Sequence, residues 1–412
     1  MKQTLLSLAA GCCLFTAMAQ TPVTVSTGAA NAEQIWYSLL NGEVGAAALA
    51  EWDLAFEMTG LTAGIRVNTA KGLTVYRTDV GIDDWDALTA PDEASWTAIY
   101  NDPTRWDFGA LNDGNNMDQP DGLDLGWGLY NMGNHQMIGN RVFAIKKADE
   151  TWMKLRINSV ISGVFSFTYA NIDGSDSHDA SFNKTAFADK NFAYWSFSSH
   201  TALDREPLNT SWDLLFTKYT DFVPTAYNVA GVLQNRLVTA MQVDGVPNDQ
   251  AQWSPGQMTS DMNVLGADWK RYDFAAGAYV IAPDTTYFVK DRPGNIWKII
   301  FTGYGGGANG NMSFTQELVS SVGVGEQAAH GQVAVYPNPV AGGRATLVLD
   351  LPAARASVRV FNNAGQQVME TSVDGLRGLT IRELDVRQLS PGLYVLRVET
   401  PGGLATGKLV IE

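Results

Sequence analysis

The residues best suited to bind a metal ion lie in two acidic loops. The first, DGSDSHD, places Asp173, Asp176 and Asp179 around His178, and carboxylate oxygens are ligands that Ca²⁺ prefers. The second, NDGNNMDQPDGLD, spans residues 112–124. Neither loop follows the EF-hand register, and acidic turns are common without a metal. We therefore expect calcium at Asp173, Asp176 and Asp179, with an ordinary turn as the alternative.

Catalytic motifs are not found in the sequence. It lacks a Gly-x-Ser-x-Gly elbow, a His-Glu-x-x-His zinc motif and a phosphate-binding Gly/Lys/Ser loop. Asp53 and Asp213 recur in similar strands, and we interpret them as residues that hold a turn or a neighbouring strand rather than as a catalytic pair. We predict a non-enzymatic protein. The alternative is a glycoside hydrolase that uses two facing carboxyl groups of a loop insertion.

Composition and charge limit the fold and the partners. Hydrophobic residues make up 45% of the 412 residues and charged residues 17%, with 40 glycines and 12 tryptophans. This balance favours short strands and many turns, so we predict an all-β fold of several domains. The net charge of −15 argues against a nucleic-acid partner, because such binding depends on Lys and Arg neutralising phosphates.

A repeated hexapeptide indicates a tandem duplication. EWDLAF at 51–56 recurs as SWDLLF at 211–216, and IWYSLLNGEV and AYWSFSSHTA precede the two copies. Farther along, two stretches with apolar residues alternating on either side of a polar turn are typical of hairpins. We predict two homologous β-rich domains in tandem, at residues 20–190 and 191–319.

The first of these units carries an insertion from residue 83 to 126. It is rich in Gly, Asn and Asp and contains Trp85, Trp96 and Trp106. Binding residues are often found on long loops of a rigid scaffold, so we predict that these three rings form a binding surface. The alternative is a surface loop held in place by buried aromatic rings.

The N-terminus is typical of a secretory signal peptide at residues 1–19. Lys2 precedes an apolar run that ends at Ala17-Met18-Ala19. Lipidation at Cys12 or Cys13 is the weaker alternative. Because both cysteines lie in the segment to be removed, thiol chemistry is excluded from the mature chain. We expect no transmembrane segment in the mature chain.

The repeated strands, the Gly126-Trp127 strand and the closing hairpin resemble the HmuY-like family of secreted haem-binding proteins, over about residues 30–320. The resemblance implies an all-β domain that holds haem by two axial side chains, His or Met. Carried onto this sequence, the ligands are Met132 and Met117, with His135 and Met137 as local substitutes. Packing residues are the alternative. Phe274 stands at the position of Met132 in the second unit, so only the first unit would keep the site.

The segment 333–412 resembles the type A sorting domain of the type IX (Por) secretion system. VAVYPNPV, VRVFNNAGQQV and SPGLYVLRVE combine strand alternation with Pro, Asn-Ala-Gly and Pro-Gly turns. The resemblance implies a β-sandwich-like domain, the type IX secretion machinery as partner, and a final location at the outer-membrane surface or outside the cell. Residues 320–332, rich in Gly and Ala, are the expected linker.

Together these patterns predict an exported non-enzymatic binding protein, with haem capture by the first domain. The alternative is a surface adhesin or structural protein that binds glycan or a host or surface protein through Trp85, Trp96 and Trp106.

Overall fold

The computed structural model describes residues 20–59, 62–119, 122–222, 224–320, 332–340, 342–351, 355–362, 365–374, 378–400 and 403–412. It confirms the all-β prediction. The expected signal peptide at 1–19 and most of the expected linker at 320–332 lie outside these residues. The first of two compact units runs to Val319, and the second begins at Ser320 and includes Pro293–Asn295.

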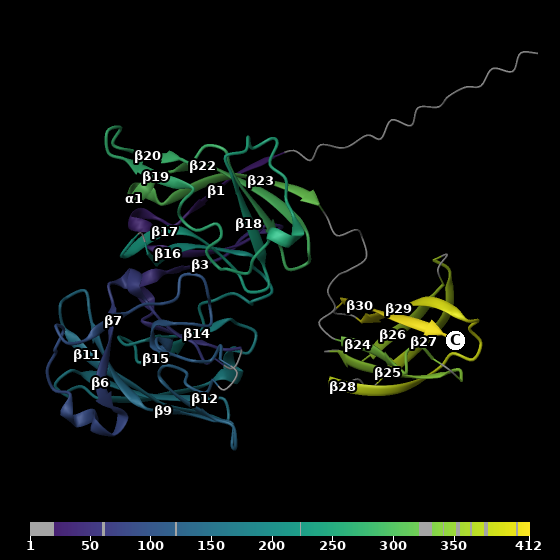
Figure 1. Cartoon of the computed structure of the whole chain (residues 1–412), viewed down its shortest axis with the longest axis horizontal. Helices are drawn as coiled ribbons and strands as arrows, with labels where there is room; N and C mark the ends of the chain where they lie inside the picture. The colour runs from purple at the N-terminus through teal and green to yellow at the C-terminus, as the bar shows by residue number, and fades with distance from the viewer. Residues whose placement is uncertain are drawn as a thin grey trace, which may run out of the picture. The chain divides into compact units, whose positions relative to one another are not determined.

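The first unit contains two sandwich-like lobes, which we call lobe A and lobe B (Figure 1). Lobe A consists of β4 (Leu54–Glu57), β5 (Ile65–Val67), β6 (Thr74–Gly81), β7 (Thr97–Ile99), β8 (Gly128–Asn131), β9 (Gln136–Gly139), β10 (Arg141–Lys146), β11 (Trp152–Ile161), β12 (Val164–Asn171), β13 (His178–Asn183), β14 (Phe192–Ser196) and β15 (Thr201–Leu203). Lobe B consists of β1 (Thr21–Ser26), β2 (Glu33–Ser38), β3 (Gly42–Ala48), β16 (Leu214–Phe222), β17 (Ala226–Gln234), β18 (Thr239–Asp244), β19 (Lys270–Asp273), β20 (Ala278–Ile281), β21 (Thr285–Lys290), β22 (Ile296–Tyr304) and β23 (Asn311–Ser320).

Short helical turns connect these strands. They are η1 (Ala29–Asn31), η2 (Leu49–Glu51), η3 (Thr69–Lys71), η4 (Ile82–Ala87), η5 (Ala110–Asn112), η6 (Lys184–Phe187), η7 (Pro255–Gln257) and the α-helical turn α1 (Gly306–Asn309). Within the described ranges, no helix has both the length and the apolar character needed to cross a membrane.

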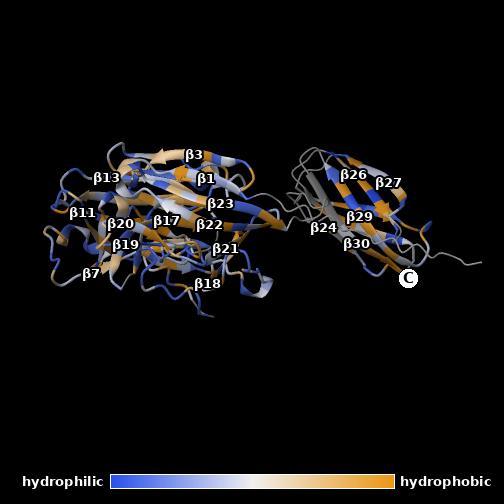
Figure 2. Cartoon of the chain, turned by 90° about the horizontal axis from the view of Figure 1, so that it is seen from above, coloured by the Kyte–Doolittle hydropathy of each residue, from blue (hydrophilic) through white to orange (hydrophobic). Residues whose placement is uncertain are grey.

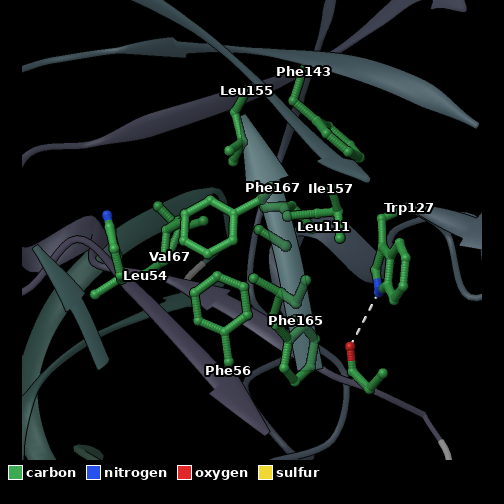
Figure 3. Close-up of a cluster of buried hydrophobic side chains, with 14 of the residues drawn as sticks. Leu54, Phe56, Val67, Leu111, Trp127, Phe143, Leu155, Ile157, Phe165 and Phe167 are labelled. Atoms are coloured by element: carbon green, nitrogen blue, oxygen red, sulfur yellow. Dashed lines mark hydrogen bonds between the residues drawn. The ribbon is translucent and has the colours of Figure 1, made fainter. Parts of the chain in front are cut away.

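The sheets of the two lobes follow the same order. Lobe A pairs its strands as β13-β12-β11-β10-β6-β7 and β15-β14-β4-β5, and lobe B as β1-β23-β22-β21-β18 and β17-β16-β2-β3. In both lobes the repeated hairpin (β10–β11 or β21–β22) lies in the first sheet and the repeated WDL strand (β4 or β16) in the second. Apolar side chains from both sheets form one core per lobe. Figure 3 shows that of lobe A, with Phe56, Phe165 and Phe167 in contact and Trp127 donating its indole N–H to the Ala63 carbonyl at 3.1 Å.

Strand pairing crosses the boundary expected at residues 190 and 191. The first three strands complete lobe B: β1 pairs with β23, and β2 pairs with β16. In Figure 1 the purple β1 lies beside the green β23. Conversely, β14 lies beyond residue 190 but pairs with β4 in lobe A. Lobe A is therefore continuous in the chain, whereas lobe B is assembled from both ends of the unit.

The repeated WDL motif makes the same contacts in both lobes. The Asp53 carboxylate accepts the amide N–H of Phe197 at 2.7 Å, and that of Asp213 accepts the amide of Leu39 at 2.8 Å. Asp53 of the first copy thus binds the residue that follows β14, a strand that precedes the second copy. Asp213 of the second copy binds the residue that follows β2, a strand that precedes the first copy. This arrangement accounts for both aspartates structurally, as the sequence predicts.

An asparagine completes the motif in each lobe. The side-chain amide of Asn68 donates to the carbonyls of Leu49 and Trp52. The Asn235 amide donates to the equivalent carbonyls of Asn209 and Trp212. These two asparagines give a residue-by-residue correspondence between the lobes, so that Lys71, three residues after Asn68, corresponds to Val238.

We predict that Asp213→Asn makes stability less sensitive to pH. Burial raises the pKa of Asp213 to about 6, above the value of about 3.9 for an exposed aspartate. The protonated carboxyl therefore stabilises the fold below pH ~4, and this contribution is lost as pH rises through 6. As the pH rises from 4 to 8, the free energy of unfolding of the variant should increase by on the order of 1–3 kcal/mol relative to that of the parent. Urea unfolding across this range measures the change, and parallel curves for the two proteins would contradict the prediction.

The second unit is a separate sandwich. Its strands are β24 (Gln332–Tyr336), β25 (Arg344–Leu351), β26 (Arg355–Phe361), β27 (Gln367–Asp374), β28 (Gly378–Asp385), β29 (Gly392–Thr400) and β30 (Gly403–Ile411). They form the sheets β24-β25-β28 and β27-β26-β29-β30 around a core that includes Leu347, Val358 and Leu396. Figure 2 shows hydrophobic and hydrophilic residues alternating along β26 and β29, the pattern expected of strands with one buried face.

Candidate functional site

The four expected haem ligands are divided between solvent and core. Met132 lies in the turn between β8 and β9 with 69% of its surface exposed. His135 shares this turn, where its Nδ1 lies 2.6 Å from the hydroxyl of Tyr130. Met137 and Met117 instead pack against the core of lobe A. Of the expected pair, Met132 is thus exposed to solvent whereas Met117 packs against the core. None of the four residues lines the cavities described below.

The predicted calcium ligands are engaged separately. Asp173 accepts hydrogen bonds from Ser175, Asp176 contacts His178 at 2.9 Å, and Asp179 accepts a hydrogen bond from the Thr168 hydroxyl at 2.7 Å. Among the described residues, no group of three or more His, Cys, Asp or Glu side chains is arranged to hold a metal ion. In this arrangement each carboxylate accepts from a local donor, as carboxylates of acidic turns do.

The insertion tryptophans do not form an exposed patch, which corrects the predicted binding surface. Trp85 is 9% exposed, and the Lys154 ammonium lies 4.6 Å from its ring. Trp96 is half-buried against Tyr76 and Trp152. The half-buried Trp106 lies between the lobes and donates its indole N–H to the Gln234 carbonyl at 2.8 Å. Large rings gain most from burial, and here they hold the insertion on the scaffold.

The insertion nevertheless contributes to a groove at the junction of the lobes. Its Tyr100 meets Phe222 at the end of the β16–β17 hairpin, with ring centroids 5.8 Å apart at 89°. The strands of this hairpin have 9 residues each, whereas the equivalent β4 and β5 have 4 and 3. The insertion is present only in lobe A and the extension of the hairpin only in lobe B, and the two meet at Tyr100 and Phe222.

Two cavities that share Tyr100 flank this contact, and we call them together the junction groove. One has a volume of about 330 Å³ and is lined by Tyr100, Asp102, Phe108, Asp113, Asn115, Phe222 and neighbouring backbone. The other has a volume of about 210 Å³ and is lined by Tyr100, Thr69, Thr220, Tyr227, Asn228 and their neighbours. Phe222 and Tyr227 are 47% and 65% exposed. Aromatic rings thus alternate with carboxyl, amide and hydroxyl groups along the groove.

Partly buried hydrogen bonds hold the polar groups of the groove in place. The Asp102 Oδ1 accepts the backbone N–H groups of Thr104 and Arg105 at 2.7 and 3.1 Å, and its Oδ2 makes no hydrogen bond within the described residues. Beneath the loop, Arg66 donates to the Asp102 carbonyl at 3.0 Å and to the Arg105 carbonyl at 2.6 Å. Burial lowers the pKa of Arg66 to about 10, so the guanidinium stays charged at neutral pH.

Across the groove, the two lobes are tied directly. The Thr220 hydroxyl donates to that of Thr69 at 2.8 Å, and the Asn228 amide donates to the Thr69 carbonyl at 3.0 Å. Because these bonds join β16 and β17 of lobe B to η3 of lobe A, the floor of the smaller cavity is formed before any ligand binds.

Sequence reasoning missed Tyr100, Phe222 and Tyr227. The run from Leu214 to Gln234 alternates around a Pro-Thr turn, which is a signal for a long hairpin. No sequence signal shows that this hairpin reaches Tyr100, because the contact depends on the packing of the two lobes.

Comparison with known proteins identifies the C-terminal unit. Residues 334–412 match the model of the secretion system C-terminal sorting domain. The chain carries a type IX sorting tail. It is therefore an exported protein, handled by the type IX secretion machinery and destined for the cell surface or the exterior. No family match supports the HmuY-like resemblance of the preceding residues.

No curated protein matches the chain. Among solved structures, the chain is similar to β-glucuronidase from Ruminococcus gnavus. The complex with uronic isofagomine is 10% identical, with 57% of this chain and 39% of that chain covered and a TM-score of 0.17. The apo enzyme is 11% identical, with 91% and 47% covered and a TM-score of 0.17. The chain spans less than half of these enzymes, and such low TM-scores carry no argument about its activity.

Proposed function

We propose that this exported protein is a non-enzymatic carbohydrate-binding protein that holds a glycan chain in the junction groove. The observation that carries the proposal is the meeting of the insertion and the long β16–β17 hairpin. The duplicated framework does not require either addition, since each lobe forms the same two sheets without the addition of the other. Ligand sites favour such junctions between structural units.

The lining of the groove supports a carbohydrate ligand. The exposed faces of Phe222 and Tyr227 offer apolar surface to the C–H face of a sugar ring. Between them, Oδ2 of Asp102 and the remaining N–H and lone pair of the Asn115 and Asn228 amides are offered to sugar hydroxyls. The two cavities joined at Tyr100 suit an extended ligand of several sugar units.

The non-enzymatic part of the proposal rests on the carboxyl groups of the groove. Asp113 forms an ion pair with Arg77 at 2.6 Å, and Asp102 caps the backbone of its own loop. Glycoside hydrolysis needs one carboxylic acid and one carboxylate free to act on the bond. Because Asp113 is held by Arg77, Asp102 lacks a second free carboxyl group among the residues that line the groove, which favours binding without cleavage.

We predict that alanine at Phe222 or Tyr227 weakens glycan binding at least tenfold, about 1.4 kcal/mol. The test is affinity electrophoresis of the full chain in gels that contain xylan, mixed-linkage β-glucan, mannan or pectin, together with a glycan array. Phe274→Ala is the matched control, because this ring is 89% exposed at the tip of the β19–β20 hairpin, outside the groove. The proposal fails if no glycan binds, or if Phe274→Ala reduces binding as much as the groove variants do.

A further inference from the structure

A separate cavity lies within lobe A. It has a volume of about 350 Å³, which is within the range of small-molecule sites. Its apolar lining comes from Leu73, Ala148, Met153 and Phe197, and its polar lining from Asp53, Lys71, Lys147, Asp149, Tyr169, Asn171, Asp176, Ser198 and His200. Leu73 is the one lining residue that it shares with the junction groove.

The carboxylates of this cavity are already occupied by protein donors. Asp53 accepts from the Lys71 ammonium at 2.6 Å and from the amide of Phe197 at 2.7 Å. Asp149 accepts from the amide and hydroxyl of Thr151. Asp176 contacts His178 at 2.9 Å. The acidic groups therefore offer little to a ligand.

By contrast, the nitrogen donors Lys147 and His200 keep hydrogen-bonding positions for a ligand. Within the described residues the Lys147 ammonium makes no hydrogen bond and no ion pair within 4 Å, although local hydrogen bonds and the charge of this ammonium lower the pKa of the neighbouring Asp149. The Tyr169 hydroxyl lies 2.6 Å from Nδ1 of His200. Burial raises the pKa of Tyr169, so the phenol keeps its proton and can donate it to Nδ1. With Nδ1 engaged by Tyr169, Nε2 is the ring nitrogen of His200 that remains for a ligand. Its ring is stacked on that of His178 with centroids 3.9 Å apart, which holds it in place.

Lobe B provides an internal comparison. The position of Lys71 is taken by Val238, which is 1% exposed in the core of lobe B. The residue directly after β10 is Lys147, and the residue directly after the equivalent β21 is Asp291. Both cations are thus absent from lobe B, although the Asp and Asn framework is the same. The shared framework does not need Lys147, and Lys71 is needed only as the partner of Asp53 in lobe A.

We propose that this cavity binds a small organic anion, namely a carboxylate carried on an apolar body. Lys147 and Nε2 of His200 donate to the carboxylate oxygens, with Lys71 adding positive charge beside Asp53. Phe197, Met153 and Leu73 contact the apolar body. An inorganic phosphate would leave this apolar surface unused, so the site favours an organic acid. This site is separate from the proposed glycan groove, and each can fail without the other.

The test is saturation-transfer NMR and titration calorimetry on the full chain. The probes are benzoate and indole-3-acetate, with benzamide and indole-3-acetamide as neutral counterparts and inorganic phosphate as a free anion. We expect one carboxylate per chain, bound at least tenfold more tightly than its amide, and no saturable phosphate binding. Equal binding of acid and amide, tighter binding of phosphate, or no saturable binding of either acid would overturn the proposal.

Variants locate the site. Lys147→Met should weaken the binding of the acids at least tenfold. Lys146→Met is the matched control, because this adjacent ammonium pairs with Glu93 and Glu150 at 3.2 and 2.9 Å and does not line the cavity. His200→Ala should also weaken binding, with unchanged tryptophan fluorescence showing that the variant is folded. Equal losses in Lys147→Met and Lys146→Met would overturn the assignment. Glycan binding should be unchanged in all three variants.

Discussion

A chain that begins at Leu49 should keep lobe A folded and lose lobe B. The missing segment carries β1, β2 and β3, which supply one edge of the first sheet of lobe B and half of the second. Ile35, Trp36, Tyr37 and Leu39 of this segment are 0–4% exposed. Burying each contributes roughly 1.5–3 kcal/mol, so their combined loss is comparable to the whole stability of a domain, about 5–15 kcal/mol.

Hydrogen exchange followed by mass spectrometry measures this effect lobe by lobe. Peptides from β16, β22 and β23 should lose protection in the shortened chain, whereas peptides from β10, β11 and β12 should keep it. Adding a synthetic peptide of residues 20–48 should restore protection. The control is a chain that ends at Val319, which removes the main segment of the second compact unit and should leave both lobes protected. Retained protection of β22 and β23 without residues 20–48 would contradict the conclusion that β1–β3 complete lobe B.

Replacing Arg236 by alanine should destabilise the first unit by about 3–5 kcal/mol. Its guanidinium joins the lobes through an ion pair of 2.6 Å with Glu57, whose side chain is 1% exposed. The other oxygen of Glu57 accepts hydrogen bonds from Gly64 and Thr62. Removing the arginine leaves a buried carboxylate without its cation, and desolvation of that charge is the main cost.

Urea unfolding followed by tryptophan fluorescence tests this in the full chain, because all 12 tryptophans precede the second unit's main segment. Glu150→Ala is the matched control: Glu150 pairs with Lys146 but is 76% exposed, so its loss should cost less than about 1 kcal/mol. The double variant Arg236→Met with Glu57→Gln should recover part of the loss, since no buried charge then lacks a partner. If Arg236→Ala costs no more than Glu150→Ala, the buried pair does not hold the lobes together.

Local patterns in the sequence predict much of the fold. Alternation in stretches such as Val358–Phe361 indicates strands with one buried face, and the turns between them indicate hairpins. The turn signals and the Tyr-Pro-Asn-Pro start of the final segment indicate the sorting domain that the family match supports. Asp53 and Asp213 are correctly predicted as structural residues, because a turn or strand-end aspartate is a local feature.

The candidate sites could not be predicted in the same way. Tyr100 and Phe222 are more than one hundred residues apart, and so are Lys71 and His200. Trp85 and Trp106 appear in a polar loop and suggest an open surface, yet tertiary packing buries one and places the other between the lobes. Burial of a loop residue depends on what folds over it, which its neighbours in the chain do not encode.

The sequence by itself determined the all-β class, the duplicated motif and the export tail, since each depends on residues close together in the chain. Only the tertiary structure decided which strands pair. Trp36-Tyr37-Ser38 and Tyr194-Trp195-Ser196 are nearly the same local signal, and either could pair with either WDL strand. Each pairs with the more distant copy, because β1–β3 complete the core of lobe B and β14 completes the core of lobe A. That choice is made by the packing of whole sheets, and it brings the insertion and the long hairpin together at Tyr100 and Phe222.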